Sequence, residues 1–163
     1  MKIISGGQTG VDRAALDVAI ERGMDWGGWC PKGGWAEDFP EPPGVLTKYS
    51  RLKETPLRNP VQRTEWNVRD SDATLIVTDA AGLSVSIGTG RAHKWARQHG
   101  KPDLIADASD PEAHALVNAW LAAQRKRFGP HMILGVGGPR ESEAPGIYVR
   151  ARALLAEVLH RPS

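Results

Sequence analysis

The sequence predicts an α/β protein of the Rossmann-like type, in which a mostly parallel sheet lies between two layers of helices. Short apolar runs alternate along the chain with segments of helical period, which is typical of βαβ units. Three of these apolar runs lead into glycine-bearing turns and then into helices. The chain has 163 residues, 40% hydrophobic and 25% charged, which indicates one globular domain over residues 1–163.

The first strand and helix follow from clear local signals. Lys2–Ser5 is a short apolar run and predicts a buried strand. Val11–Arg22 predicts a helix, because its apolar residues recur on one stripe and Gly23 follows as a stop.

The middle of the chain is less regular. Residues 24–60 are rich in Gly, Pro and Trp, and we expect one short strand and an irregular excursion there. Asn59 followed by Pro60 predicts the N-cap and first residue of a helix that reaches about Asp70. The remaining elements are predicted as a strand over 74–78, a helix over 88–99, a strand over 104–106, a helix capped by Asp110-Pro111, a strand over 132–137 and a last helix opened by Pro145.

Composition narrows the classes of function. The net charge of +2 is spread along the chain, so we expect no nucleic-acid partner. No apolar run approaches the roughly 18 residues of a membrane span, and the N-terminus has no secretory pattern. The one cysteine, Cys30, fits a reducing cytoplasm, and we expect it to be a buried small side chain. The five histidines have no metal-site spacing, so no metal held by protein side chains is expected.

The turn Gly6-Gly7-Gln8-Thr9-Gly10 is the first candidate binding element. Glycines let the backbone approach a ligand, and the following helix offers free N–H groups and a positive dipole end, which favour a phosphate or carboxylate. The lysine of a Walker P-loop is absent, so no NTPase is predicted. The alternative is a tight strand-to-helix turn without a ligand.

Two further turns are expected at the same edge of the sheet. The second contains Gly88-Thr89-Gly90, and the third begins at Gly138. In the third turn, Arg140 could hold a phosphate, and Glu141 could accept a ribose hydroxyl or orient Arg140. The alternative for these two residues is a surface ion pair. Since parallel strands end at one edge, the three turns predict one pocket there.

Two other segments allow more than one interpretation. Residues 61–72 are densely polar, and they are either part of a site or the solvated face of a helix, with Trp66 expected in the core. Residues 29–35 could form a lid, in which Lys32 meets an anionic ligand or is simply solvated.

The chain resembles the proposed molybdenum cofactor carrier proteins, which form the circularly permuted YpsA group of the SLOG superfamily. The resemblance covers nearly the whole chain and rests on four motifs in order. These motifs are Ile4–Asp17, Gly28–Gly33, Arg63–Asp72 and Gly138–Tyr148.

This resemblance implies a Rossmann-like three-layer fold that is circularly permuted relative to LOG-type phosphoribohydrolases, which cleave nucleoside monophosphates to free bases. Gly6–Gly10 looks like the first glycine loop of those enzymes, and Ser86–Thr89 looks like part of their Pro-Gly-Gly-x-Gly-Thr-x-x-Glu motif. Their first strand looks like the segment from Met132 to Ser142. The glutamate of that motif is missing, because Gly90-Arg91-Ala92-His93-Lys94 follows here. A lysine cannot replace a carboxylate that stabilises an oxocarbenium-like centre, so binding is favoured over hydrolysis.

We therefore expect a cytoplasmic protein that binds a small phosphorylated ligand, either the molybdenum cofactor (molybdopterin) or a nucleotide, without a catalytic residue. The alternatives are a nucleotide-processing enzyme that uses Asp12 or Glu141 as an acid, and a ligand sensor that reports to a partner protein. The family resemblance also implies a homo-oligomer, a dimer or tetramer. The predicted ligand-binding residues are Gly6, Gly7, Gln8, Thr9, Gly10, Asp12, Lys32, Gly88, Thr89, Gly90, Gly138, Arg140, Glu141 and Ser142.

Overall fold

The computed structural model describes residues 1–160, and its centre is a six-stranded sheet. The strands lie in the order β3-β2-β1-β6-β4-β5, and every neighbouring pair is parallel. This confirms the predicted fold class. The strands are β1 (Lys2–Ile4), β2 (Asp25–Cys30), β3 (Leu52–Glu54), β4 (Ala73–Thr78), β5 (Asp103–Asp107) and β6 (Ile133–Gly137).

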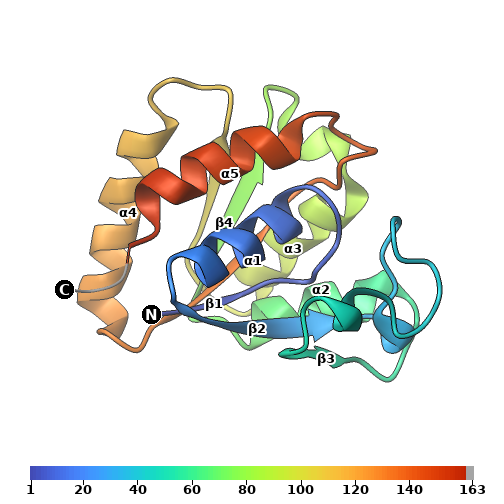
Figure 1. The fold of residues 1–163 in the computed structure, drawn as a ribbon. Helices are drawn as coiled ribbons and strands as arrows, with labels where there is room; N and C mark the ends of the chain where they lie inside the picture. The colour runs from blue at the N-terminus through green and yellow to red at the C-terminus, as the bar shows by residue number, and fades with distance from the viewer. Residues whose placement is uncertain (161–163) are drawn as a thin grey trace.

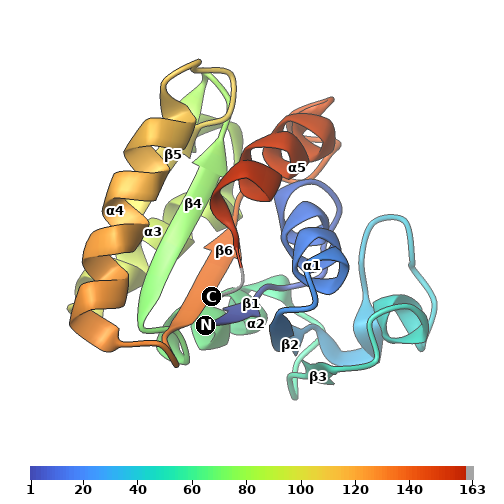
Figure 2. The ribbon, with the colours of Figure 1, turned by 60° about the vertical axis from the view of Figure 1, so that its left-hand side comes forward.

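Helices cover both faces of the sheet (Figures 1 and 2). The main core lies between the sheet and the helices α1 (Val11–Glu21), α4 (Ala113–Phe128) and α5 (Ile147–Val158). A smaller core lies on the other face, against α2 (Pro60–Arg69) and α3 (Ile87–Gln98). β4 serves both cores, because successive side chains of a strand point to opposite faces.

The strand β6 contributes buried side chains to only one of these cores. Leu134 and Val136 are buried in the main core. Gly135 and Gly137 face the opposite way: a Cβ on Gly135 would overlap Ser71 Oγ, and one on Gly137 would lie 3.6 Å from Asp12 Oδ1. The sheet therefore presents bare backbone beneath α2 and α3 at the carboxyl end of β6.

Residues 24–60 contain more regular structure than predicted. We expected one short strand, but both β2 and β3 join the sheet, and β2 pairs with β1 on one side and β3 on the other. Gly27 and Gly28 within β2, and the length of only three residues in β3, weaken the pattern that would reveal them. The excursion between these strands extends from the edge of the sheet (Figure 2) and contains two short 3₁₀ turns, Lys32–Gly34 and Gly44–Thr47.

Helix starts also differ from the prediction at two places. Asp110 does not cap α4, which begins at Ala113; its carboxylate instead accepts a hydrogen bond from the N–H of Glu112 in the turn before the helix. The last helix begins at Ile147, two residues after Pro145, because Gly146 adopts a left-handed conformation at its N-cap. The other predicted helices and strands are present within one or two residues of their expected bounds.

Asp17 on α1 joins three parts of the chain. Its two carboxylate oxygens accept hydrogen bonds from Tyr49 in the excursion, at 2.6 Å, and from Tyr148 on α5, at 2.7 Å. Burial, together with the carboxylate of Asp17, raises the pKa of the Tyr148 hydroxyl to about 12. The side chain of Tyr49 is fully buried, so its hydroxyl has no access to solvent as an alternative partner.

We expect Asp17→Asn to lower the free energy of unfolding by about 2 kcal/mol, because the amide accepts only one tyrosine hydroxyl and carries no charge. Urea denaturation of the variant and the wild type measures this difference. Asp25→Asn is the matched control, since it removes an exposed carboxylate in an exposed ion pair with Arg51 and should change stability by less than about 1 kcal/mol. Equal stability of the two variants would contradict the prediction.

Candidate functional site

A cavity of about 350 Å³ opens at the carboxyl ends of β1, β6 and β4, on the face covered by α2 and α3. This is the place where the strand order changes direction, since the chain runs outward from β1 to β2 and from β4 to β5. Ligands of open α/β sheets bind at such points. Each of the three predicted turns contributes to the lining, through Gly6, Gln8, Asp12, Gly88, Thr89, Gly138 and Arg140.

The floor and walls of the cavity come from different elements. Gly135 and Gly137 of β6 line the floor; the Ser71 side chain packs over Gly135, and the space over Gly137 is open, since a Cβ there would meet only Asp12 Oδ1, at 3.6 Å. α2 contributes Arg63 and Thr64 to one wall, and the start of α3 forms another. Trp35 reaches the lining from the excursion, and Arg91 and Arg140 add positive charge.

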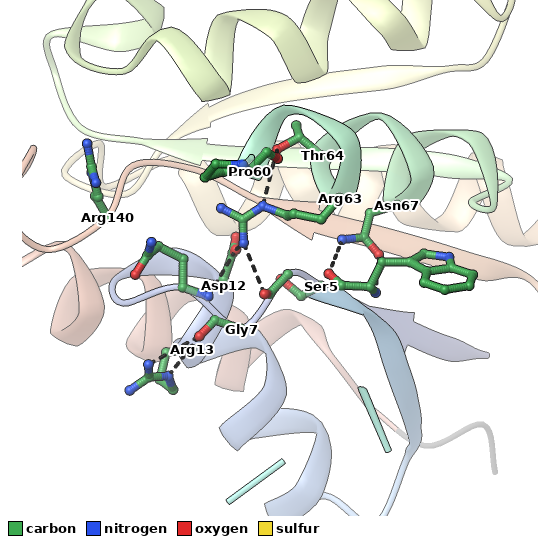
Figure 3. Close-up of polar contacts among 12 residues, drawn as sticks. Ser5, Gly7, Asp12, Arg13, Pro60, Arg63, Thr64, Asn67 and Arg140 are labelled. Carbon is green, nitrogen blue, oxygen red and sulfur yellow. Dashed lines mark hydrogen bonds and ion pairs between the residues drawn. The ribbon is translucent and has the colours of Figure 1, made fainter. Parts of the chain in front are cut away.

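Asp12 and Arg63 form a buried ion pair in this cavity (Figure 3). Nη1 of Arg63 lies 3.5 Å from Oδ2 of Asp12 and donates a hydrogen bond of 3.0 Å to the carbonyl oxygen of Gly6. The exposed fractions are only 8% for Asp12 and 9% for Arg63. Gly6 must lack a side chain, because a Cβ there would lie 2.5 Å from Arg63 Nη1 and 2.8 Å from Asp12 Oδ2.

The protonation of Asp12 is shifted by its surroundings. Burial raises the pKa of its carboxyl group above the ordinary value, and the charge of Arg63 and a hydrogen bond from the N–H of Gln8 offset only part of that effect. The arginine is therefore needed to keep a carboxylate at this depth.

The start of α3 offers the clearest place for an anion. Ser86 caps the helix, since its hydroxyl accepts a hydrogen bond of 3.2 Å from the N–H of Thr89. The hydroxyls of Thr89 and Thr74 both belong to residues that line the cavity and are only 3% exposed. Neither hydroxyl has a hydrogen-bond partner within residues 1–160. Buried polar atoms without partners are uncommon; Thr89 lies in the first turn of α3, at the positive end of the helix dipole, and Thr74 lies near the start of β4.

The first turn lies only partly in the cavity. Gly7 and Gly10 have positive φ angles and pack against protein: a Cβ on Gly7 would lie 2.8 Å from Leu52 Cδ1, and one on Gly10 would lie 2.9 Å from the backbone nitrogen of Glu141. The hydroxyl of Thr9 donates to the carboxylate of Glu37 and accepts the N–H of Glu141. Thr9 and Gly10 therefore join the first and third turns, and Gly7 packs against β3; none of the three belongs to the cavity lining.

In the third turn too, some residues line the cavity and others make contacts only within the protein. Glu141 does not line the cavity; its carboxylate accepts hydrogen bonds from the N–H groups of Gly146 and Tyr148 and so caps the start of α5. Ser142 donates through its N–H and hydroxyl to Glu37. Arg140 does line the cavity, and its Nε lies 3.3 Å from Glu143 and 3.8 Å from Glu37.

Lys32 and Gly90 also lie outside the cavity lining. Lys32 is exposed in the first 3₁₀ turn of the excursion, and Gly90 lies in the first turn of α3 with open space around it.

Sequence reasoning missed several residues of this cavity. The polar pattern of residues 61–72 leaves Arg63 open as a surface residue or a site residue; in the structure, Arg63 and Thr64 line the wall. Ser86 could have been found as an N-cap, because a serine three residues before Thr89 precedes the helix.

Trp66, expected in the core, is instead half-buried against Trp29, with the Arg69 guanidinium 4.5 Å from its ring centroid. Cys30 is buried as expected, and burial raises the pKa of its thiol to about 11.

Within residues 1–160, no group of three or more His, Cys, Asp or Glu side chains is arranged to hold a metal ion. In the same part of the chain, no helix combines the length and apolar character that crossing a membrane requires.

Comparison with known proteins agrees with this architecture. A profile described as the circularly permutated YpsA SLOG family matches residues 3–159. A crystal structure at 1.45 Å resolution from Syntrophus aciditrophicus, described as a "putative molybdenum carrier protein", is similar with a TM-score of 0.82 and 40% sequence identity. The match covers 97% of this chain and 94% of the other. The comparison with curated proteins gave no match.

Proposed function

The chain belongs to the circularly permuted YpsA family of SLOG proteins, and we propose that it binds a small phosphorylated ligand without transforming it. The ligand would occupy the cavity beneath α2 and α3, with its phosphate at the start of α3. The observation that carries this proposal is the pair of buried threonine hydroxyls, Thr74 and Thr89, that line the cavity without a partner in the described chain. An anion beside Thr89 would accept its hydroxyl and interact favourably with the helix dipole.

The size and lining of the cavity support a phosphorylated ligand of cofactor or nucleotide size. A volume of about 350 Å³ lies within the range of cofactor and nucleotide sites. The protein from S. aciditrophicus described as a "putative molybdenum carrier protein" supports molybdopterin as the first candidate, and a nucleotide phosphate is the second. Molybdenum would then arrive coordinated by the dithiolene of the pterin. Arg91 and Arg140 at the lining would attract either phosphate.

Calorimetric titration with molybdopterin, nucleoside monophosphates and ribose 5-phosphate tests this function. We expect binding of ribose 5-phosphate, the simplest phosphorylated probe, together with tighter binding of at least one ligand that also carries a ring. Absence of measurable binding for every probe would contradict the proposal.

Thr89→Val should weaken binding of ribose 5-phosphate by roughly tenfold, the equivalent of one lost hydrogen bond to a charged group. The substitution keeps the shape of the side chain and removes its hydroxyl. Thr78→Val is the matched control, because Thr78 ends β4 and its hydroxyl donates to the carbonyl oxygen of Ala106, outside the cavity lining. Equal affinities of the wild type and Thr89→Val would argue against a phosphate at this helix.

A nucleotide-processing enzyme is the second candidate, and one observation favours it. Asp12 lines the cavity, and burial raises the pKa of its carboxyl group, as a general acid requires. Glu141, the other acid considered, is bound by the N–H groups of Gly146 and Tyr148. Release of free base from a panel of nucleoside monophosphates, lost in Asp12→Asn, would support this activity; no turnover across the panel would exclude it.

The assembly and location of the protein remain predictions. We propose a homo-oligomer, on the basis of the family and of exposed apolar side chains such as Leu116 and Val149. We propose a cytoplasmic location on the basis of the single cysteine. Sedimentation velocity on the purified protein tests the oligomeric state.

A further inference from the structure

We propose that the Asp12–Arg63 pair binds the heterocycle of the ligand rather than its phosphate. Building on the function proposed above, we assign to this pair the recognition of an amide-type edge, in which a ring carbonyl adjoins a ring N–H. Oxopurine and pterin rings both present such an edge. The phosphate would then lie at the other end of the cavity, at Thr89.

Arg63 retains hydrogen-bonding capacity beyond its contacts within the protein. Nε of Arg63 donates to Thr64 Oγ1 at 3.3 Å, and Nη1 faces both Gly6 and Asp12. Nη2 has no hydrogen-bond partner among residues 1–160, and it points toward the side where Arg140 lies (Figure 3). The guanidinium group can therefore still donate two hydrogen bonds.

The carboxylate of Asp12 has matching capacity. Oδ2 accepts the N–H of Gln8 at 3.3 Å and faces Arg63. The Ser5 hydroxyl lies near this carboxyl group but donates its hydrogen to the carbonyl oxygen of Val136, so Oδ1 keeps its capacity to accept. Oδ1 lies at the floor, 3.6 Å from the position of a Cβ on Gly137. The pair thus presents one acceptor atom and one donor group side by side in the lining of the cavity.

The charge of the pair argues against a phosphate at this position. Arg63 is already paired with a carboxylate, so the two side chains together carry no net charge. A phosphate that approached Nη2 would also approach Oδ1, which can only accept hydrogen bonds while the group is ionised. A neutral ring edge complements both groups, because its carbonyl accepts a hydrogen bond from Nη2 and its N–H donates one to Oδ1.

Strand spacing separates the two ends of the site. Asp12 follows β1 and Thr89 follows β4, and β6 lies between these strands. The carboxylate of Asp12 lies over Gly137 of β6, and α3 packs against β4 and β5, so the two ends lie over different strands, at least about 5 Å apart. A ring joined to a phosphate through a short sugar or alkyl link spans such a distance, and the floor at Gly137, which carries no side chain, leaves room for it.

The test compares two nucleotides that differ in this edge. Inosine 5′-monophosphate has the ring carbonyl and N–H, and purine riboside 5′-monophosphate lacks both. We expect the wild type to bind the first at least about tenfold more tightly, because a site that hydrogen-bonds a polar edge rejects the analogue without it. Dihydroneopterin monophosphate, as a second arm, shows whether the preferred ring is a pterin or a purine.

The variant Asp12→Asn distinguishes recognition of the ring from binding of the phosphate. It should abolish the preference for inosine monophosphate and leave the dissociation constant of ribose 5-phosphate within about twofold of the wild type. Asp25→Asn, at an exposed carboxylate outside the cavity lining, should keep the preference intact. The comparison of the two nucleotides on the wild type stands even if Asp12→Asn does not fold.

Two results would overturn the inference. Equal binding of the two nucleotides to the wild type, with ribose 5-phosphate also bound, would exclude ring recognition while leaving the proposed function in place. A large change in ribose 5-phosphate binding in Asp12→Asn would show that the pair acts on the phosphate. If no phosphorylated probe binds the wild type, the proposed function itself fails and this inference falls with it.

Discussion

Replacing Arg63 with methionine is expected to lower the free energy of unfolding by about 3 to 5 kcal/mol. The substitution leaves the buried carboxylate of Asp12 without its cation, and the hydrogen bond to the carbonyl oxygen of Gly6 is also lost. Urea denaturation monitored by tryptophan fluorescence measures the effect.

Two controls separate this effect from the general loss of a charged side chain. Arg152→Met removes an arginine from an exposed ion pair with Glu21 and should cost less than about 1 kcal/mol. The double variant Asp12→Asn with Arg63→Met should recover part of the loss, because no uncompensated charge remains buried. A cost below about 1 kcal/mol for Arg63→Met would contradict the account of the pair.

The same variant should show a distinct pH dependence. Burial raises the pKa of Asp12 in the folded protein above its ordinary value of 3.8, so the folded state binds this proton more tightly than the unfolded state. The contribution of Asp12 to stability is therefore fully present below pH 3.8 and is lost as the pH rises through the raised pKa. Arg63→Met raises that pKa further. The stability difference between the variant and the wild type should thus shrink as the pH falls toward about 4.

Gly138→Ala should cost at least about 3 kcal/mol and also disturb the cavity. A Cβ on Gly138 would overlap the carbonyl oxygen of Val77 and lie 2.7 Å from Val11 Cγ2. Both neighbours are fixed, since Val77 belongs to the central strand β4 and Val11 begins α1. The end of β6 would have to move away from its neighbours, and urea denaturation measures the cost.

Gly90→Ala is the matched control for this change. Gly90 lies in the first turn of α3, and a Cβ there would meet no atom within 4 Å. Alanine at such a helical position should stabilise the protein by about 0.5 to 1 kcal/mol. Similar losses in both variants would show that the tight packing of Gly138 is not the cause.

The fold was predictable because its signals are local. The apolar run at β4 and the apolar stripe of α1 each indicate an element, and their alternation indicates a parallel sheet. β3 was missed because three residues, two of them charged, show too little pattern to recognise. Its place in the sheet depends on pairing with β2, which no local signal reveals.

The position of the candidate site could be predicted from the sequence, but several of its residues could not. Three glycine turns at one sheet edge indicated where the cavity lies. A glycine, however, can allow close packing within the protein as readily as contact with a ligand. Gly7 and Gly10 both pack closely against other parts of the protein. Glu37 was not predicted to hold Thr9 and Ser142, because its contacts reach 28 and 105 residues along the chain.

Arg63 illustrates the remaining difficulty. A charged residue on a polar helix is ordinarily solvated, so no sequence signal indicates that Arg63 is buried. Its burial depends on Gly6, which leaves room for the guanidinium group, and on Asp12, which compensates its charge. Both partners lie more than 50 residues away, and only the folded chain brings them together.

A crystal structure of the protein grown with inosine 5′-monophosphate shows directly which group each end of the cavity binds. We expect electron density in the cavity, with the phosphate within hydrogen-bond distance of Thr89 Oγ1 and the ring edge against Asp12 and Arg63. Density for the phosphate at Arg63, or at the turn Gly6–Gly10 with Thr89 still unpartnered, would contradict both assignments.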